Sequence, residues 1–279
     1  MSRIQLVLLT VMVMVAFAAN SLLCREALSV GHIDAASFTF VRIISGAAIL
    51  SLLLLVKFRR YQLGGSWGSA AALFVYAAAF SFSYISLSAG TGALLLFGAV
   101  QTTMIVYGLW LGERLTIYQV VGAVAASGGI VWLMLPGIEA PPLLGATLML
   151  LSGISWGVYS LLGRGTANPT AATAGNFMRA VPFAAILLVV LGNTQMTWVG
   201  VAYAFASGAI ASGMGYALWY VVLPALAATT AATIQLSVPV IAAFGGVLLL
   251  GEAVTLRFGL ASIAVLGGVL LFVASKQKA

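Results

Sequence analysis

The sequence predicts an all-α, polytopic membrane protein of ten transmembrane helices, built as two inverted five-helix repeats with pseudo-twofold symmetry. Hydrophobic residues make up 63% of the 279 residues and charged residues only 6%, whereas a soluble domain carries about a quarter charged residues. Ten apolar stretches each approach the roughly 20 residues that a helix needs to cross a bilayer. The last five stretches repeat the first five, and an odd number of spans per repeat turns the second copy upside down.

Two short motifs reveal the repeat. Asn-Ser-Leu-Leu-Cys-Arg at 20–25 returns as Tyr-Ser-Leu-Leu-Gly-Arg at 159–164, and Leu-Gly-Glu at 111–113 returns at 250–252, both at an offset of 139 positions. Inverted repeats are typical of carriers that bind substrate between the halves and expose it to each side of the membrane in turn. The two expected units are 1–136 and 137–279.

The expected helices lie near 4–24, 35–56, 67–87, 91–111, 117–135, 143–163, 171–191, 198–221, 228–250 and 256–274. Eight basic residues then lie on the side of the amino terminus, and two, Arg25 and Arg257, on the other. This bias places both termini in the cytoplasm. The first stretch also resembles a secretory signal peptide, with Ala16-Phe-Ala18 as its cleavage site. We expect it to be retained, because its end is repeated in the sixth helix.

The first and sixth helices are repeat partners with polar or aromatic residues on one face. Spacings of three and four place Asn20 and Cys24 together on the first helix, and Trp156 and Tyr159 together on the sixth. Cys24 is the single cysteine of the chain, so an internal disulfide is excluded. We interpret Cys24 as a packing residue.

The second and seventh helices each carry one arginine inside the apolar stretch. Arg42 lies seven residues into the second helix, or roughly 10 Å along its axis, and Arg179 occupies the matching place in the seventh. Either guanidinium is a possible partner for a substrate carboxylate. We favour the structural interpretation, in which both reach the membrane interface or bond carbonyls at helix ends.

The third and eighth helices carry clusters of aromatic residues. Tyr76, Phe80 and Tyr84 share one side of the third helix, and Tyr216 and Trp219 share one side of the eighth. Adding one glutamine each from the fourth and ninth helices gives an uncharged, aromatic cavity between the halves. The expected substrate-binding residues are Asn20, Tyr76, Phe80, Tyr84, Gln101, Trp156, Tyr159, Tyr216, Trp219 and Gln235.

The Leu-Gly-Glu motifs close the fourth and ninth helices. Glycine ends a helix by turning into the left-handed region, and the glutamate after it lies just before the next helix, whose amino-terminal end favours negative charge. We therefore assign Glu113 and Glu252 to tight corners at opposite faces of the membrane. In the fifth and tenth helices, Gly129 and Gly268 each follow an alanine by four positions, a spacing that lets helices pack closely.

These residues resemble the drug/metabolite transporter superfamily, in its ten-helix branch with two tandem EamA-type repeats. The resemblance covers the whole chain and implies a pseudo-twofold bundle, a central cavity and export of small metabolites. Within the superfamily, the size and the aromatic helices are similar to those of bacterial amino-acid exporters, including exporters of aromatic amino acids. The resemblance therefore places the chain in the bacterial inner (plasma) membrane.

The five acidic residues all fall in loops or at helix ends of this map. Because proton-coupled carriers keep an ionisable group inside the membrane, we expect facilitated transport without a coupling carboxylate. An aromatic cavity suits neutral amino acids, since rings stack and hold ammonium groups. Exchange of sugar phosphates or nucleotide sugars, and export of quaternary-amine drugs, remain the alternatives within the superfamily.

Other classes of protein fit the sequence less well. The helices contain no nucleophile and base pair for an enzyme, no metal-ligand cluster and no ring of charge for an ion channel, which stays the alternative from another class. The basic residues, at a net charge of +7, form no stripe for nucleic acid. We expect no cofactor, and partners limited to a small-molecule substrate and the lipid bilayer, with a monomer as the functional unit.

Overall fold

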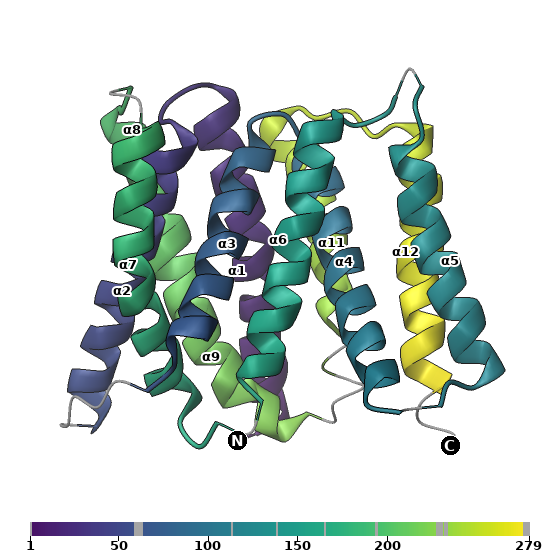
Figure 1. Cartoon of the computed structure of the whole chain (residues 1–279), viewed down its shortest axis with the longest axis horizontal. Helices are drawn as coiled ribbons and strands as arrows, with labels where there is room; N and C mark the ends of the chain where they lie inside the picture. The colour runs from purple at the N-terminus through teal and green to yellow at the C-terminus, as the bar shows by residue number, and fades with distance from the viewer. Residues whose placement is uncertain are drawn as a thin grey trace.

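The computed structural model describes residues 2–58, 64–112, 114–137, 139–164, 166–192, 195–226, 231 and 234–275. Within these ranges the chain is helical and forms no strand, and eight helices are long and apolar enough to cross a membrane. Figure 1 shows the helices side by side, with α1 beginning and α12 ending at the same end of the bundle. The protein is an all-α, polytopic membrane protein.

In chain order the elements are α1 (Arg3–Ser29), α2 (Ala35–Phe58), α3 (Trp67–Tyr84), α4 (Ala89–Trp110), α5 (Ile117–Met134), α6 (Leu143–Leu162), α7 (Pro169–Leu191), α8 (Trp198–Phe205), η1 (Ala206–Met214), α9 (Gly215–Val222), η2 (Leu223–Ala225), α11 (Ser237–Leu250) and α12 (Leu256–Ser275). The elements from α8 to η2 form one run of 28 residues. Within the expected ninth helix, α11 has 14 residues. The count of ten spans stays a prediction.

Hydroxyl side chains determine where several helices begin. Ser66 and Ser88 accept hydrogen bonds from backbone amides in the first turns of α3 and α4. Thr116 and Gln119 form a capping box at the start of α5, in which each side chain bonds the other's backbone amide. Such caps satisfy donors that have no partner inside the helix.

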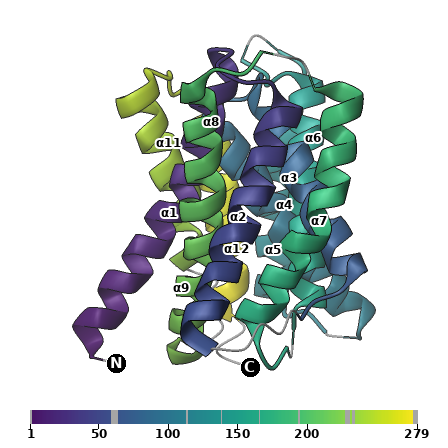
Figure 2. The same ribbon diagram turned by 90° about the vertical axis from the view of Figure 1, so that its left-hand side faces the viewer.

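Apolar side chains cover much of the outside of the bundle. Figure 2 shows the first turns of α1 leaning away from the other helices, where Ile4 is 73% exposed and Val7 60%. In water such a surface favours aggregation. In lipid it costs nothing, because the acyl chains are as apolar as the side chains.

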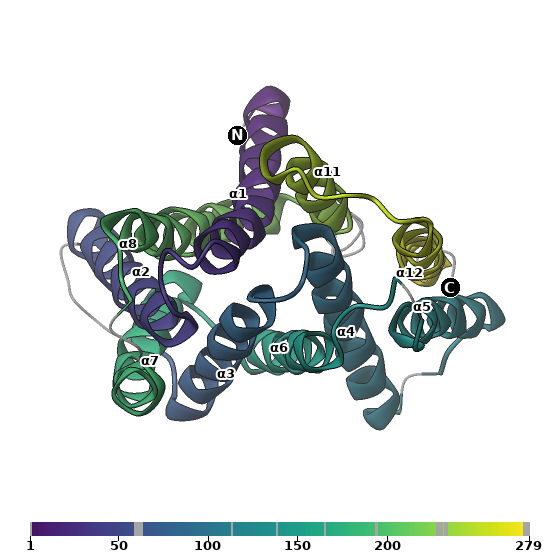
Figure 3. The same cartoon turned by 90° about the horizontal axis from the view of Figure 1, so that it is seen from above.

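The helices of one expected unit pack against the helices of the other in matching pairs. Helix α2 packs on α7, α4 on α11 and α5 on α12, and the packing of α3 on α6 is matched by that of η1 and α9 on α1. Each of these contacts joins elements of the two expected units, as Figure 3 shows from above. This arrangement supports the predicted inverted repeat, which itself stays a prediction, together with the unit boundary at 136 and 137.

Helices α5 and α12 form a pair set to one side of the bundle (Figures 1 and 3). A Cβ added to Gly129 would lie 2.9 Å from the Cβ of Ala264, and one added to Gly268 would lie 2.6 Å from the backbone nitrogen of Ala126. Both distances are too short for a side chain, so the expected packing role of these two glycines is confirmed. Gly128 and Gly267, their neighbours in sequence, face open space.

Candidate functional site

Arg42 lies in the protein interior, with 2% of its surface exposed. Its Nη2 donates to the hydroxyl of Tyr76 at 2.8 Å and to that of Ser212 at 3.5 Å. The guanidinium carbon lies 5.1 Å from the ring centroid of Tyr76 and 4.7 Å from that of Phe80, within cation–π range. The expectation that Arg42 reaches the interface or bonds carbonyls is therefore wrong, because α3 and η1 enclose the side chain.

Arg179, the counterpart in the second half, behaves as the structural interpretation expects. Its Nη1 donates to the backbone oxygens of Gly64 at 2.7 Å and Gly175 at 3.0 Å. The bond to Gly64 ties α7 to the segment that precedes α3, and the bond to Gly175 stays within α7. The two arginines occupy matching places in the sequence but have different surroundings, so the site is not symmetric.

A chain of polar side chains surrounds Arg42. The amide nitrogen of Asn20 donates to the Tyr76 hydroxyl at 3.4 Å, and the Ser207 hydroxyl donates to the amide oxygen of Asn20 at 2.5 Å. The side chains come from α1, α3 and η1. Buried polar groups of this kind need partners, and the network joins the two expected halves of the chain.

The element η1 is a π-helix, and its geometry brings two serines to this network. Ser207 and Ser212 are five residues apart, the spacing of the backbone hydrogen bonds in a π-helix, so the wider turn brings them toward the same face. In an α-helix, at 3.6 residues per turn, these serines would point about 140° apart. The α-helical spacing expected for 198–221 therefore does not place Ser207 on the face of Ser212. The signal that points to Ser207 is the repeated Ser-Gly pair at 207–208 and 212–213.

Trp156 lies at the centre of an aromatic cluster. Its ring centroid is 4.8 Å from that of Tyr76, 5.3 Å from Tyr159 and 5.1 Å from Tyr216. Phe17 is not among the expected substrate-binding residues. Its ring centroid lies 5.8 Å from that of Tyr216 and 6.2 Å from that of Trp219, so Phe17 connects Trp219 to the cluster. The cluster draws on α1, α3, α6 and α9, and Trp156 itself stays partly exposed.

The structure brings together seven of the expected substrate-binding residues: Asn20, Tyr76, Phe80, Trp156, Tyr159, Tyr216 and Trp219. Tyr84 touches Phe80, but its hydroxyl donates to the backbone oxygen of Ala89 at 3.3 Å, so it braces the start of α4. Gln101 and Gln235 are partly buried and make no hydrogen bond to the cluster within the described ranges.

An ion pair joins several helices at the end of the bundle opposite the start of α1. Arg25 Nε lies 3.1 Å from a carboxylate oxygen of Glu252, and Arg25 also donates to the backbone oxygens of Tyr84 and Ile85. The same carboxylate accepts from the backbone nitrogen of Ala89 at 2.8 Å. Glu252 therefore caps α4, rather than the helix that follows it in sequence.

The corner before that glutamate has the expected geometry. Gly251 adopts a φ of +66° and Gly112 a φ of +85°, the left-handed region that glycine occupies without strain. The prediction that these glycines end their helices through a left-handed turn is thus confirmed. Glu113, the counterpart of Glu252, lies outside the described residues.

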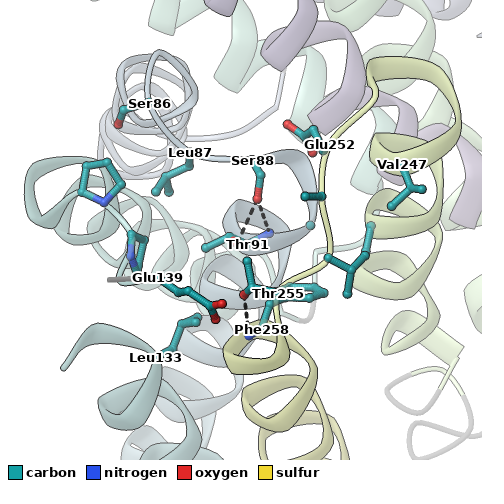
Figure 4. A pocket seen from close by; sticks show the side chains of 16 residues that line it. Ser86, Leu87, Ser88, Thr91, Leu133, Glu139, Val247, Glu252, Thr255 and Phe258 are labelled. Atoms are coloured by element: carbon teal, nitrogen blue, oxygen red, sulfur yellow. Dashed lines mark hydrogen bonds between the residues drawn. The ribbon is translucent and has the colours of Figure 1, made fainter. Parts of the chain in front are cut away.

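Two cavities lie elsewhere in the bundle. The first, about 230 Å³, lies next to the Arg25–Glu252 pair, and its walls include Glu139, Ser88 and Thr255 (Figure 4). The second, about 600 Å³, lies between α4, α5 and α6 and includes Tyr107 and Trp110. Neither wall contains a residue of the aromatic cluster, whose rings pack on one another. The central cavity stays a prediction.

An apolar helical bundle with a polar, aromatic interior fits a membrane transporter of small molecules. The model of the EamA-like transporter family matches residues 143–274. An uncharacterized protein of Pseudomonas aeruginosa is 58% identical over 247 residues, which are 88% of this chain and 86% of that protein. This chain belongs to the EamA-like transporter family.

More distant relatives match smaller parts of the sequence or the fold alone. The threonine/homoserine exporter RhtA of Salmonella typhimurium is 28% identical over 130 residues, or 44% of each chain. A crystal structure of a protein with 17% sequence identity aligns over 100% of both chains with a TM-score of 0.70. That likeness shows a shared fold.

Proposed function

We propose that this transporter exports neutral amino acids, with aromatic ones among them, by alternating access around the Trp156 cluster. The observation that carries the proposal is the position of Trp156 among rings from both expected halves of the chain. A site between inverted repeats becomes open to one side of the membrane when the halves rock one way, and to the other side when they rock back.

The chemistry of the cluster fits such a substrate. Aromatic faces stack with a substrate ring or hold an ammonium group, and the hydroxyl of Tyr76 and the amide of Asn20 are polar groups beside them. The relative named as a threonine/homoserine exporter supports an amino-acid substrate. In the packed state described here, the rings of Trp156 and Tyr216 must separate before a substrate enters.

The alternatives fit less well. A sugar-phosphate exchanger needs several inward cations, whereas Arg179 is engaged by two backbone carbonyls. A carrier of quaternary amines needs an inward carboxylate, whereas within the described ranges no carboxylate bonds a residue of the cluster and Glu252 is paired with Arg25. An ion channel needs a lined pore, and single-channel recording distinguishes it from a carrier with slow, saturable turnover.

Counterflow in proteoliposomes tests the proposal. Purified full-length protein is loaded with one unlabelled compound, and uptake of labelled phenylalanine, threonine, tetraethylammonium or glucose 6-phosphate is measured. We expect saturable exchange of the amino acids, independent of a proton gradient. Exchange of the phosphate or the quaternary amine with no exchange of any amino acid would overturn the proposal.

A further inference from the structure

The guanidinium of Arg42 has an unused edge. Its Nη1 is fully buried and has no hydrogen-bond partner in the described structure, although Nη2 bonds Tyr76 and Ser212. An arginine stays charged at all physiological pH values. A buried cation with a free donor is strongly destabilising unless an anion compensates it, so the interior of the protein is poised to receive one.

No carboxylate contacts Arg42 in the part that the structure describes, and Glu26 lies in the last turn of α1. Glu252 is paired with Arg25. Asp34 accepts from the backbone of Ala36 and Ser37 at the start of α2, and Glu139 accepts from the backbone nitrogen of Arg257. These carboxylates lie at helix ends, whereas Arg42 lies in the body of α2. The charge of Arg42 is therefore left for a ligand.

We propose that the Nη1 edge of Arg42 binds the carboxylate of the transported substrate, and that the substrate class is the small monocarboxylate. The inference rests on the proposed function and deepens it. A hydrogen bond from a charged Nη1 to a carboxylate oxygen is roughly twice as strong as one between neutral groups. Tyr76 links the two parts of the site, because its hydroxyl accepts from Arg42 and its ring lies against Trp156.

The surroundings of Arg42 restrict which anions fit. The rings of Tyr76 and Phe80 lie within cation–π distance of the guanidinium, and two hydroxyls occupy Nη2. The unpartnered Nη1 remains and can donate to one carboxylate group. Because the counterpart Arg179 donates from its Nη1 to Gly64 and Gly175, the Nη1 of Arg42 has no symmetric equivalent in the described structure. Dianions and phosphates would bring more negative charge than this edge neutralises.

Competition on the wild-type protein gives the first test. Uptake of labelled phenylalanine into proteoliposomes is competed with phenylalanine, phenylalaninamide, phenethylamine and 3-phenylpropionate. We expect the two compounds without a carboxylate to compete at least about tenfold more weakly than phenylalanine, and phenylpropionate to remain a competitor. Equal competition by the amide would overturn the carboxylate subsite without recourse to any variant.

Variants assign the effect to Arg42. We expect Arg42→Gln to lower phenylalanine uptake by about tenfold or more and to abolish the discrimination between acid and amide, with partial recovery in Arg42→Lys. Arg179→Gln is the matched control and should keep the discrimination. Normal phenylalanine uptake by folded Arg42→Gln would overturn the proposal.

The two proposals fail in different ways. Binding of phenylpropionate is followed separately through quenching of tryptophan fluorescence, with Trp156 beside the site. Arg42-dependent binding of phenylpropionate without transport of any amino acid would leave the carboxylate subsite standing and overturn the proposed function. Amino-acid transport without a preference for the carboxylate would leave the proposed function standing and overturn the carboxylate subsite. If Arg42→Gln does not fold, the wild-type competition decides.

Discussion

Trp156 is the residue whose removal should separate aromatic from small substrates. Its indole contacts three other rings of the cluster. We expect Trp156→Ala to weaken the binding of phenylalanine by about 0.5–2 kcal/mol, the range for a lost stacking or cation–π contact. The binding of threonine should weaken by less. The measurement is the half-saturating concentration for counterflow of each amino acid.

Gln101→Ala is the control for that prediction. Gln101 was expected in the site on sequence grounds, yet it makes no bond to the cluster in the described ranges. We expect its substitution to leave the preference for phenylalanine over threonine unchanged. If folded Trp156→Ala bound phenylalanine and threonine more weakly by the same factor, Trp156 would not be part of the substrate site.

The contacts of a single residue could be predicted from the sequence where its position along a helix determines them. They could not be predicted where they depend on which neighbouring helix the side chain faces. Gly251 and Arg179 behave as expected, because a helix end and nearby backbone carbonyls determine their partners. For Arg42, depth along α2 suggested escape to the interface. The depth of a residue along its helix does not determine which neighbour its side chain faces. For the same reason, the apolar segments around Gln101 and Gln235 did not show whether these side chains face the cluster.

At the scale of elements, η1 departs most from what the sequence predicts. Apolar length indicates a helix over 198–221, but it gives no sign that nine residues in the middle follow a wider turn. Because Ser207 and Ser212 both bond to the polar network from this segment, we expect the site to depend on the π-helix. Such segments occur often at functional sites.

The close packing of η1 against α2 gives a direct test. A Cβ added to Gly208 would collide with the backbone oxygen of Arg42 and the hydroxyl of Ser45. We expect Gly208→Ala to destabilise the protein by about 1–3 kcal/mol, the range for overpacking an interior. Thermal unfolding in detergent, with tryptophan fluorescence as the probe, measures the change.

Gly128→Ala serves as the matched control in α5. A Cβ at Gly128 meets nothing within 4 Å, and alanine favours a helix over glycine by up to about 1 kcal/mol. We expect this variant to be as stable as wild type or slightly more so. Equal stability of Gly208→Ala and wild type would mean that η1 does not hold the described geometry.

At the scale of the whole molecule, composition and the repeat gave the membrane class, and the family comparison bears it out. The sequence did not predict that the rings at the centre pack on one another, because helix faces do not specify how far apart the helices lie. Nor did it predict the two cavities, which form where helices diverge near α4.

The orientation of the bundle in the membrane can be tested with cysteine labelling. Single cysteines are placed at Ser2 and at Lys278, which lies outside the described residues, in a Cys24→Ser background. We expect a membrane-impermeant maleimide to label both positions only from the cytoplasmic side, because basic residues collect at that end. Labelling of either position in intact cells would show that the map is inverted or that a span is miscounted.

The buried charge of Arg42 also has an electrical consequence. A unit charge that crosses the full membrane field gains about 2.3 kcal/mol for each 100 mV. In a carrier that alternates access, Arg42 senses part of that field, and an inside-negative voltage favours the state that opens toward the cytoplasm. A zwitterionic substrate adds no net charge, so the voltage acts equally on the empty and the loaded carrier. In the proposed exporter, the voltage then supplies no net driving force, but it favours the state that faces the cytoplasm, the compartment from which such an exporter loads.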